Sequence, residues 1–454
     1  MKSISIPSIN PFTQEVIQTH STLTGEELEN KISEAHKAYL KWKNTSFDNR
    51  SKILYKVADL LEKNREEYAY LITTEMGKPI NQAHAEIRKC MWVCKFYAEH
   101  AEFFLQSKTI KTQAQKSYIC YESQGIVLGV MPWNFPFWQV FRFCVPAIMA
   151  GNSAILKHAS NVMGCAKAIE NIFKEAELPN AVFSSLIITS NAVEKIINHP
   201  YVTGVVLTGS EKAGSNVAAQ AGRNLKKSVL ELGGSNALIV MEDCDIKETL
   251  EACIQARFLN VGQSCIAGKR LLLHRDIAEE FITNLLKRIE KMTIGDPLNP
   301  ETYISVLARE DLAETLEEQV DKSIAMGAKL LTGGKRDGAF YPPTVLTDVS
   351  LAMPVCKEET FGPVLPIIII DTLEEAIKIS NETDFGLGVS IFTNDSYRIE
   401  KNIARFEEGC VFINDFVKSD PRLPFGGIKR SGYGRELSKD GIMEFVNKKT
   451  VVIK

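Results

Sequence analysis

The N-terminal part of the chain carries apolar side chains at intervals of three and four residues, the spacing of helices that bury one face. Thr24 and Glu27 make the pattern of a capping box at the start of the first helix. Its apolar positions are Leu28, Ile32, Ala35, Tyr39 and Trp42. Residues 82–104 are predicted to form one long helix. We therefore expect this part of the chain to be helical.

After residue 125 the pattern changes to short apolar runs that alternate with helical segments. The runs cover residues 126–130, 154–156, 183–188, 205–207 and 237–240. Such alternation predicts a parallel sheet covered by helices, with ligands bound at the carboxyl ends of the strands. A second series of the same kind follows Cys265. Because 454 residues exceed what one core usually organises, two large α/β domains are expected.

Two polar, β-branched stretches stand apart from this alternation. Residues 108–122 read as a hairpin, and residues 450–453 read as a terminal strand. The hairpin has too little apolar surface for a core of its own, so it must lie against something else. The pattern leaves two alternatives open, an edge hairpin of the same subunit and a contact between subunits.

Composition excludes several classes of protein. With 24% charged residues and a net charge of −3, nothing favours nucleic acid or an anionic membrane as a partner. No apolar run reaches the roughly 18 residues of a membrane span. Ten cysteines lack paired spacing and the first residues lack a secretory pattern, so reduced thiols in a cytoplasmic protein are expected. Seven dispersed histidines indicate no metal site.

Cys265 is the first candidate for chemistry. It lies in Asn-Val-Gly-Gln-Ser-Cys-Ile-Ala-Gly-Lys-Arg, residues 260–270, where small and polar residues end an apolar helical pattern. A cysteine becomes nucleophilic where backbone dipoles or cations lower its pKa in a partly open place, and this segment favours such surroundings. Taken alone, a cysteine is more often a small buried hydrophobe.

Two further motifs follow buried strands. Asn134 lies between two prolines in Pro-Trp-Asn-Phe-Pro, where a fixed amide can donate a hydrogen bond to an oxyanion, although such an Asn also suits a tight turn. Glu231 lies in Leu-Glu-Leu-Gly-Gly, where burial between apolar residues would raise its pKa and make it a general base. The usual alternative for Glu231 is a salt-bridged or solvated carboxylate.

Two strand ends suit a nucleotide. Lys157 is followed by His158, Ala159 and Ser160, which offers a cation and a hydroxyl to a ribose or phosphate. Residues 209–214, Gly-Ser-Glu-Lys-Ala-Gly, open a helix whose free N–H groups can meet a phosphate. This segment departs from the G-x-G-x-x-G fingerprint, so by itself it is a weak dinucleotide signal.

Five motifs in one order resemble the aldehyde dehydrogenase superfamily over essentially the whole chain. They are residues 132–136, Glu-Leu-Gly-Gly at 231–234, Gly-Gln-Ser-Cys at 262–265, Glu-Glu-Thr-Phe-Gly-Pro at 358–363 and Pro-Phe-Gly-Gly-Ile-Lys-Arg-Ser-Gly at 424–432. The resemblance implies that Cys265 is the nucleophile, that Glu231 activates water, and that Asn134 and the Cys265 N–H form the oxyanion hole. The expected reaction is NAD(P)-dependent oxidation of an aldehyde to a carboxylic acid.

The resemblance also implies a cofactor site. Its residues would be Trp133, Lys157, His158, Ala159, Ser160, Gly209, Ser210, Leu232, Glu359 and Phe361. NAD-preferring relatives often carry Glu at the position of Ser160, where it repels a 2′-phosphate. Ser160 removes that repulsion and leaves Lys157 free to pair with phosphate, so we predict that NADP is accepted, with NAD second.

Within the superfamily the chain is most similar to bacterial NAD(P)-dependent succinate-semialdehyde dehydrogenases. Arg142 matches the Arg that binds the substrate carboxylate in that group, and Ser419 matches its Ser. The second Arg of longer members is Leu259 here, so Gln139 and Arg257 are the expected substitutes.

An alternative is an enzyme for general or aromatic aldehydes. Four aromatic residues would then line a hydrophobic tunnel, namely Phe137, Trp138, Phe141 and Phe416. A structural or binding protein with the same fold but without enzymatic activity is a different class. The presence of Cys265, Glu231 and Asn134 argues against that class.

For the architecture, we expect a Rossmann-like NAD(P)-binding domain of residues 1–108 and 125–232 and a second α/β domain of residues 233–435 that carries Cys265. Residues 109–124 and 436–454 would form a small β extension. The resemblance implies homodimers or homotetramers assembled through that extension.

Overall fold

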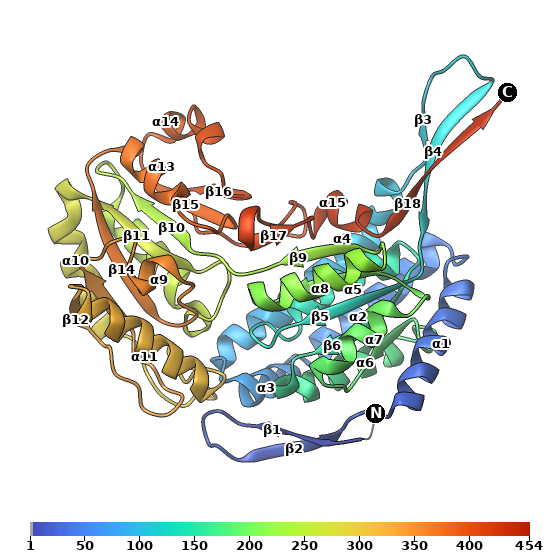
Figure 1. The fold of residues 1–454 in the computed structure, drawn as a ribbon, viewed down its shortest axis with the longest axis horizontal. Coiled ribbons are helices and arrows are strands. Elements are labelled where there is room, and N and C mark those ends of the chain that lie inside the picture. Colours follow the sequence, from blue (N-terminus) through green and yellow to red (C-terminus); the bar gives the residue numbers. More distant parts are fainter. Residues whose placement is uncertain (1–2) are drawn as a thin grey trace.

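The computed structural model describes residues 3–454 and contains two separate sheets flanked by helices, as Figure 1 shows. The first sheet has the strand order β17-β9-β8-β5-β6-β7. Its parallel strands are β5 (Ile126–Met131), β6 (Ser153–His158), β7 (Phe183–Ser185), β8 (Val202–Thr208) and β9 (Lys227–Glu231). The predicted parallel α/β sheet is confirmed.

Helices enclose the first sheet. They are α1 (Gly25–Trp42), α2 (Phe47–Lys63), α3 (Arg65–Met76), α4 (Ile80–Phe104), α5 (Trp138–Met149), α6 (Met163–Glu175), α7 (Val193–Asn198) and α8 (Glu211–Arg223). The capping box at α1 is present, since the Thr24 hydroxyl accepts from Glu27 N at 3.2 Å and Thr24 N donates to the Glu27 carboxylate at 2.7 Å. A hairpin of β1 (Ser5–Ile9) and β2 (Val16–Ser21) precedes α1 and was not predicted.

The second sheet has the order β12-β13-β14-β11-β10-β15-β16. Its strands are β10 (Asn236–Val240), β11 (Gly268–His274), β12 (Lys329–Thr332), β13 (Thr344–Thr347), β14 (Val364–Ile370), β15 (Gly388–Phe392) and β16 (Cys410–Ile413), and only β12 pairs antiparallel. The accompanying helices are α9 (Ile246–Phe258), α10 (Arg275–Glu290), α11 (Glu310–Ala325), α12 (Pro354–Lys357), α13 (Leu373–Asn381) and α14 (Ser396–Glu400).

After the second sheet the chain returns to the first one. Strand β17 (Gly432–Tyr433) pairs antiparallel with the end of β9, opposite Glu231. Helix α15 (Ser438–Met443) then packs on α4 and α5. The segment that we placed in the second domain therefore contributes a strand to the first sheet, and the domain outline stays a prediction.

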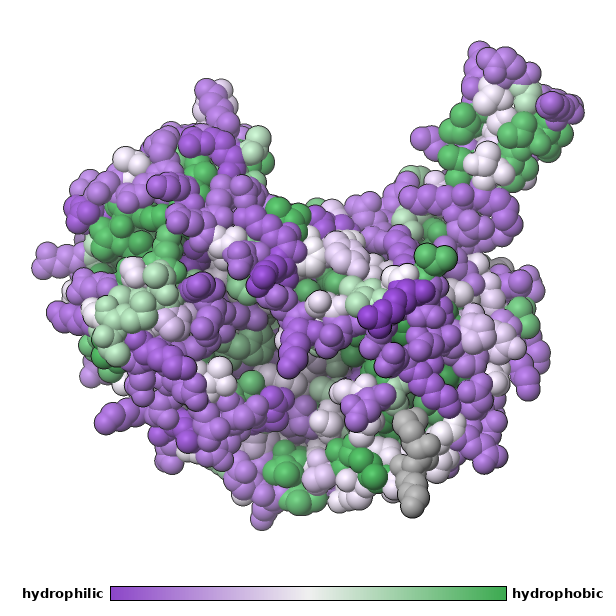
Figure 2. Space-filling model, in the orientation of Figure 1, coloured by the Kyte–Doolittle hydropathy of each residue, from purple (hydrophilic) through white to green (hydrophobic). Residues whose placement is uncertain are grey.

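A three-stranded arm projects from the body of the molecule (Figure 1). It consists of β3 (Lys108–Thr109), β4 (Lys116–Ser123) and β18 (Val446–Ile453), and β18 pairs with β4 along its full length. The arm carries exposed hydrophobic surface (Figure 2). Ile110, Val452 and Ile453 are among the exposed hydrophobic residues of the chain. The hairpin and terminal strand thus lie against each other. Within residues 3–454, no helix is long and apolar enough to cross a membrane.

Candidate active site

Cys265 lies on a loop between α9 and β11 whose backbone is unusual. The loop begins with a short 3-10 helix, Leu259–Gly262, in which Asn260 and Val261 both have φ of 56°. This left-handed conformation is costly for a β-branched residue. Gly262 follows at φ 73°, and a Cβ there would lie 2.5 Å from the Gly362 carbonyl oxygen. The turn ends the helical pattern and turns the chain toward Cys265.

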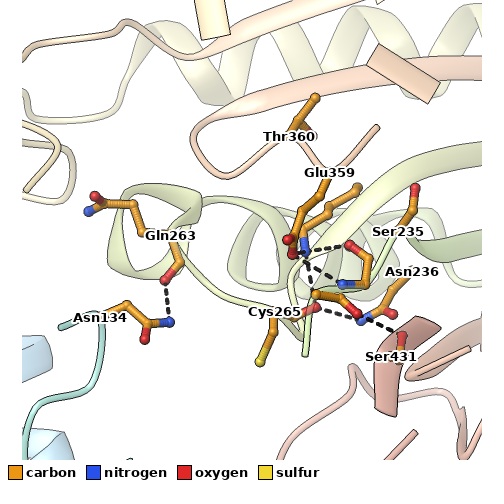
Figure 3. A network of polar contacts seen from close by, with 12 residues as sticks. Asn134, Ser235, Asn236, Gln263, Cys265, Glu359, Thr360 and Ser431 are labelled. Carbon is orange, nitrogen blue, oxygen red and sulfur yellow. Dashed lines mark hydrogen bonds and ion pairs between the residues drawn. The ribbon is translucent and has the colours of Figure 1, made fainter. Parts of the chain in front are cut away.

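Side-chain hydrogen bonds hold this turn against the Pro-Trp-Asn-Phe-Pro segment. The Asn260 amide donates to the backbone carbonyls of Asn134 at 2.8 Å and Gln263 at 3.1 Å. The Asn134 amide donates to the same Gln263 carbonyl at 3.1 Å, as Figure 3 shows. That bond uses one of the two amide hydrogens of Asn134 and leaves the other free for an oxyanion.

A second network fixes the other side of the loop (Figure 3). Lys269 Nζ donates to the carbonyls of Gly234 at 2.6 Å and Cys265 at 3.0 Å and pairs with Glu359 at 2.5 Å. The carbonyl of Cys265 is thereby held, while its sulfur points away from the network. Lys269 was missed as a site residue, although it stands four positions after Cys265.

The Cys265 thiol is half-buried, and its pKa differs from the one we expected. Burial raises the pKa to about 11, although the charges of Lys269 and Arg142 act to lower it. The expectation of a lowered pKa was therefore wrong for this structure, because desolvation outweighs the cations. The thiol must lose its proton as it reacts.

Glu231 ends β9 and is 2% exposed. Neither carboxylate oxygen has a hydrogen-bond partner among residues 3–454. Burial and the neighbouring Glu436 carboxylate hold the pKa of Glu231 well above its usual range, against the charge of Arg142. A carboxylate whose pKa is raised in this way holds a proton more readily than an exposed one, which suits a general base.

Cys265 borders two cavities. One has a volume of about 460 Å³ and is closed by residues of α4, α5 and α9. The other has a volume of about 370 Å³ and is also lined by Asn134 and Glu231. Cys265, the predicted nucleophile, thus borders both cavities, and the predicted oxyanion donor and general base line the second.

Most of the predicted cofactor residues meet in the second cavity. Its lining includes Trp133, Gly209, Ser210, Leu232, Glu359 and Phe361. Ser210 caps α8, so free N–H groups at the start of that helix border the cavity. A Cβ at Gly233 would lie 2.3 Å from the Glu359 carboxylate, so a larger residue there would require the Glu359 side chain to shift.

The segment of residues 157–160 lies outside that lining. Ser160 is exposed and borders a neighbouring groove with Arg309, while Lys157 is 8% exposed at the end of β6. His158 is fully buried, and burial lowers its pKa to about 4. The neutral ring therefore donates from Nε2 to the Pro136 carbonyl at 2.8 Å and accepts from Ala159 N at 2.9 Å. His158 and Ala159 thus brace the Pro-Trp-Asn-Phe-Pro turn.

Three of the four predicted substrate residues line the first cavity, namely Gln139, Arg142 and Ser419. Arg257 does not. Its buried guanidinium donates to the backbone carbonyls of Thr360 at 3.1 Å and Gly268 at 3.4 Å, behind the nucleophile loop. The structure gives Arg257 a bracing role, and we do not carry it into the substrate site.

Arg142 is engaged within the protein. Its Nε pairs with Glu436, its Nη2 donates to the Thr208 hydroxyl at 3.2 Å, and its guanidinium lies 4.9 Å from the centre of the Phe425 ring. Both partners of the ion pair are nearly inaccessible to solvent. The positive charge that we predicted for substrate binding is already matched by a carboxylate.

Sequence reasoning missed Lys89, which also lines the first cavity. Its Nζ donates to the Ser419 hydroxyl at 2.7 Å and lies 4.5 Å from the centre of the Trp138 ring. Lys89 stands on α4 within a helical pattern, where a charged residue is usually solvated, so no local signal marks it.

The four aromatic residues of the alternative prediction separate in the structure. Trp138 lines the first cavity, whereas Phe137 and Phe141 are completely buried in the core. Phe416 is not among the lining residues. No tunnel of these four side chains forms, and no cluster of His, Cys, Asp or Glu in residues 3–454 has the arrangement of a metal site.

A cysteine that borders two cavities, with a buried carboxylate and an amide donor lining one of them, is the arrangement expected of a thiol-dependent enzyme whose substrate and cofactor occupy different cavities. The family model described as "Aldehyde dehydrogenase family" matches residues 1–451. The chain therefore belongs to the aldehyde dehydrogenase family, as its motifs predicted.

Individual relatives are similar over their whole length. A Synechocystis protein named probable succinate-semialdehyde dehydrogenase, with NADP+ in its name, is 46% identical over 99% of this chain and all of its own. A succinate semialdehyde dehydrogenase of Escherichia coli K12, with NAD(P)+ in its name, is 42% identical over 98% of this chain and 97% of its own. The crystal structure of a Streptococcus pyogenes succinic semialdehyde dehydrogenase with NADP+ has a TM-score of 0.96 at 35% identity, with 99% of both chains covered.

Proposed function

We propose that this aldehyde dehydrogenase oxidises succinate semialdehyde to succinate, with NADP+ as the preferred cofactor and NAD+ as the second. Full-length similarity to the Synechocystis, Escherichia coli and Streptococcus proteins supports the substrate and the cofactors. The observation that carries the proposal is the first cavity, which is lined by Cys265 and by a lysine, Lys89, that pairs with no carboxylate within residues 3–454. A substrate with a carboxylate at one end and an aldehyde at the other fits these two features.

The second cavity fits a nicotinamide dinucleotide. Gly209 and Ser210 begin α8 at its edge, where a Cβ on Gly209 would meet only one atom, at 3.7 Å. The backbone there is open to a phosphate. Trp133, Phe361 and Leu232 offer apolar contact, and Glu359 is fixed by Lys269. When bound there, NAD(P)+ supplies the hydride acceptor that turns a thiohemiacetal into a thioester.

The chain's own residues begin the reaction. The Cys265 sulfur adds to the aldehyde carbon as its proton leaves, and a thiohemiacetal forms on Cys265. Negative charge that develops on the former carbonyl oxygen meets the free hydrogen of the Asn134 amide. Because Asn134 is already held by Gln263, it needs little reorganisation.

Glu231 completes turnover. Its raised pKa lets it accept a proton from the water that attacks the thioester, after which succinate leaves and Cys265 is restored. The nearby charge of Arg142 acts to lower the pKa of Glu231, against the larger effects of burial and the Glu436 carboxylate. Arg142 thus affects the pKa of Glu231 as well as contributing positive charge to the first cavity.

Steady-state kinetics with two aldehydes tests the proposal. Wild type should show a kcat/KM about a hundredfold higher for succinate semialdehyde than for uncharged butyraldehyde, which corresponds to roughly 2.7 kcal/mol of transition-state discrimination. NADP+ should give a higher kcat/KM than NAD+. Equal rates for the two aldehydes would leave the family assignment in place and contradict the substrate.

The remaining parts of the proposal concern assembly and context. We propose a homodimer or homotetramer joined through the arm, because Ile110, Val452 and Ile453 expose apolar surface there. Light scattering of wild type and of Val452→Glu tests this assembly.

A role in 4-aminobutyrate breakdown follows from the substrate. A cytoplasmic location agrees with ten free cysteines and is tested by cell fractionation.

A further inference from the structure

Four cationic side chains line the first cavity, and they differ in what they contact. Lys78 pairs with Glu86, Arg142 with Glu436, and Arg288 with Glu251. Lys89 is the exception, because within residues 3–454 it has no carboxylate within ion-pair distance. The two carboxylates whose charges act on Lys89 are both paired with other cations, Asp420 with Arg422 and Glu86 with Lys78.

We propose that Lys89, together with Ser419, binds the carboxylate of the substrate and thereby determines the preference for an acid aldehyde, an inference that rests on the proposed oxidation of succinate semialdehyde. The two side chains come from distant parts of the chain, lie 2.7 Å apart (Nζ to Oγ), and line the same cavity as Cys265. In this assignment Lys89, and not Arg142, carries the charge that the substrate meets.

The hydrogen bond between them prepares both groups. Lys89 Nζ donates to the Ser419 oxygen, so the hydroxyl hydrogen of Ser419 remains free to donate to a carboxylate. The ammonium keeps two further hydrogens, and the Trp138 face beside it limits where they point. An ammonium and a hydroxyl side by side form a two-point receptor for one carboxylate.

An already paired cation is a poorer receptor. A substrate carboxylate that approached Arg142 would have to share the guanidinium with Glu436, and the two anions would repel each other in a buried place. Lys89 has no such competitor, so the incoming carboxylate neutralises it without displacing another anion.

The surroundings of Lys89 also predict how pH acts. Burial, and then the charge of Arg142, lower the pKa of Lys89 to about 8, although Cys90, Asp420 and Glu86 act to raise it. Lys89 is therefore charged below about pH 8 and neutral above it. Because kcat/KM reports the ionisation of free enzyme, the preference for the acid aldehyde should decline as pH rises through that value.

The test is the ratio of kcat/KM for succinate semialdehyde to kcat/KM for butyraldehyde, in the intact enzyme with NADP+. In Lys89→Met the ratio should fall at least thirtyfold, and in Ser419→Ala about threefold to tenfold. Lys95→Met is the matched control, because Lys95 is an exposed lysine on the same helix, and its ratio should equal that of wild type. Since each ratio is taken within one preparation, differences in the amount of folded enzyme cancel.

Lys89→Arg distinguishes a role of the positive charge at residue 89 from a purely structural role of its side chain. Its ratio should stay high up to about pH 10, whereas the wild-type ratio falls above pH 8, because a guanidinium does not lose its proton in that range. A wild-type preference that survives in Lys89→Met, or that falls equally in Lys95→Met, would overturn the assignment to Lys89. Absence of any preference in wild type would instead overturn the proposed substrate.

Discussion

The two cavities beside Cys265 are constructed in different ways. The cavity that we propose for the cofactor is formed at strand ends by glycines, backbone N–H groups and short contiguous motifs, including residues 209–210 and 231–233. The cavity that we propose for the substrate is formed by long charged side chains from α4 and α5 and by a loop near Ser419. A cofactor common to a family can be held by backbone, whereas the choice of substrate rests on side chains that meet only in the fold.

The largest effect should come from the residue that both cavities share. Cys265→Ala removes the nucleophile, so aldehyde oxidation should fall by about four orders of magnitude or more. Binding of NADPH, followed by its fluorescence, should persist because the second cavity keeps its other walls. Cys244→Ala, a half-buried cysteine in a surface turn, is the control and should keep full activity. Residual activity above a thousandth of wild type would contradict the role of Cys265.

The next effect separates hydride transfer from hydrolysis. Glu231→Gln should slow steady-state turnover by roughly 10²-fold to 10⁴-fold but still give a rapid burst of reduced cofactor, because the first half of the reaction does not need the base. In wild type the hydrolysis rate should fall as pH is lowered through the raised pKa of Glu231, since protonation removes the base. Glu231→Gln should lose that dependence. A variant without a burst would show that Glu231 acts earlier.

The site residues that could be predicted from the sequence differ between the two cavities in the same way. Cys265, Asn134 and Glu231 each stand in a contiguous motif, so their roles could be proposed from sequence. Lys89 could not, because its partner Ser419 is 330 positions away and a helix pattern treats a single lysine as solvated surface. Arg142 was found, but its ion pair with Glu436 was not, because only the return of the chain through β17 brings residue 436 to α5.

The local backbone conformation of the Cys265 loop could likewise not be predicted from the sequence. The left-handed turn at Asn260 and Val261 contradicts the preference of a β-branched residue, and contacts with Asn134 and Gln82 make up for it. The raised pKa of Cys265 likewise depends on packing that no motif specifies. The hydrophobic patterns of the strands depend only on residues close in sequence, and they predicted both sheets.

A stability measurement tests whether Arg142, unlike Lys89, is held in an ion pair within the protein. Arg142→Met leaves Glu436 buried without its partner, which should destabilise the protein by about 3 to 5 kcal/mol in denaturant unfolding. The loss should shrink as pH falls, because the raised pKa of Glu436 lets it become neutral. Arg275→Met breaks an exposed pair with Asp371 and should change the stability far less than Arg142→Met does. A small cost at Arg142 would mean that its charge is free for substrate after all.

The smallest effect concerns the edge of the cofactor side, at exposed Ser160. Ser160→Glu should lower kcat/KM for NADP+ relative to NAD+ by about tenfold, because a carboxylate there repels a 2′-phosphate and competes for Lys157. Since the position is exposed, the effect should weaken as salt is raised from 0.05 to 0.5 M. Ser160→Ala distinguishes repulsion from a lost hydroxyl contact, because it removes the hydroxyl without adding charge and should keep most of the NADP+ preference. If Ser160→Ala loses that preference as fully as Ser160→Glu, a hydrogen bond selects the cofactor, and side chains decide specificity on both sides of Cys265.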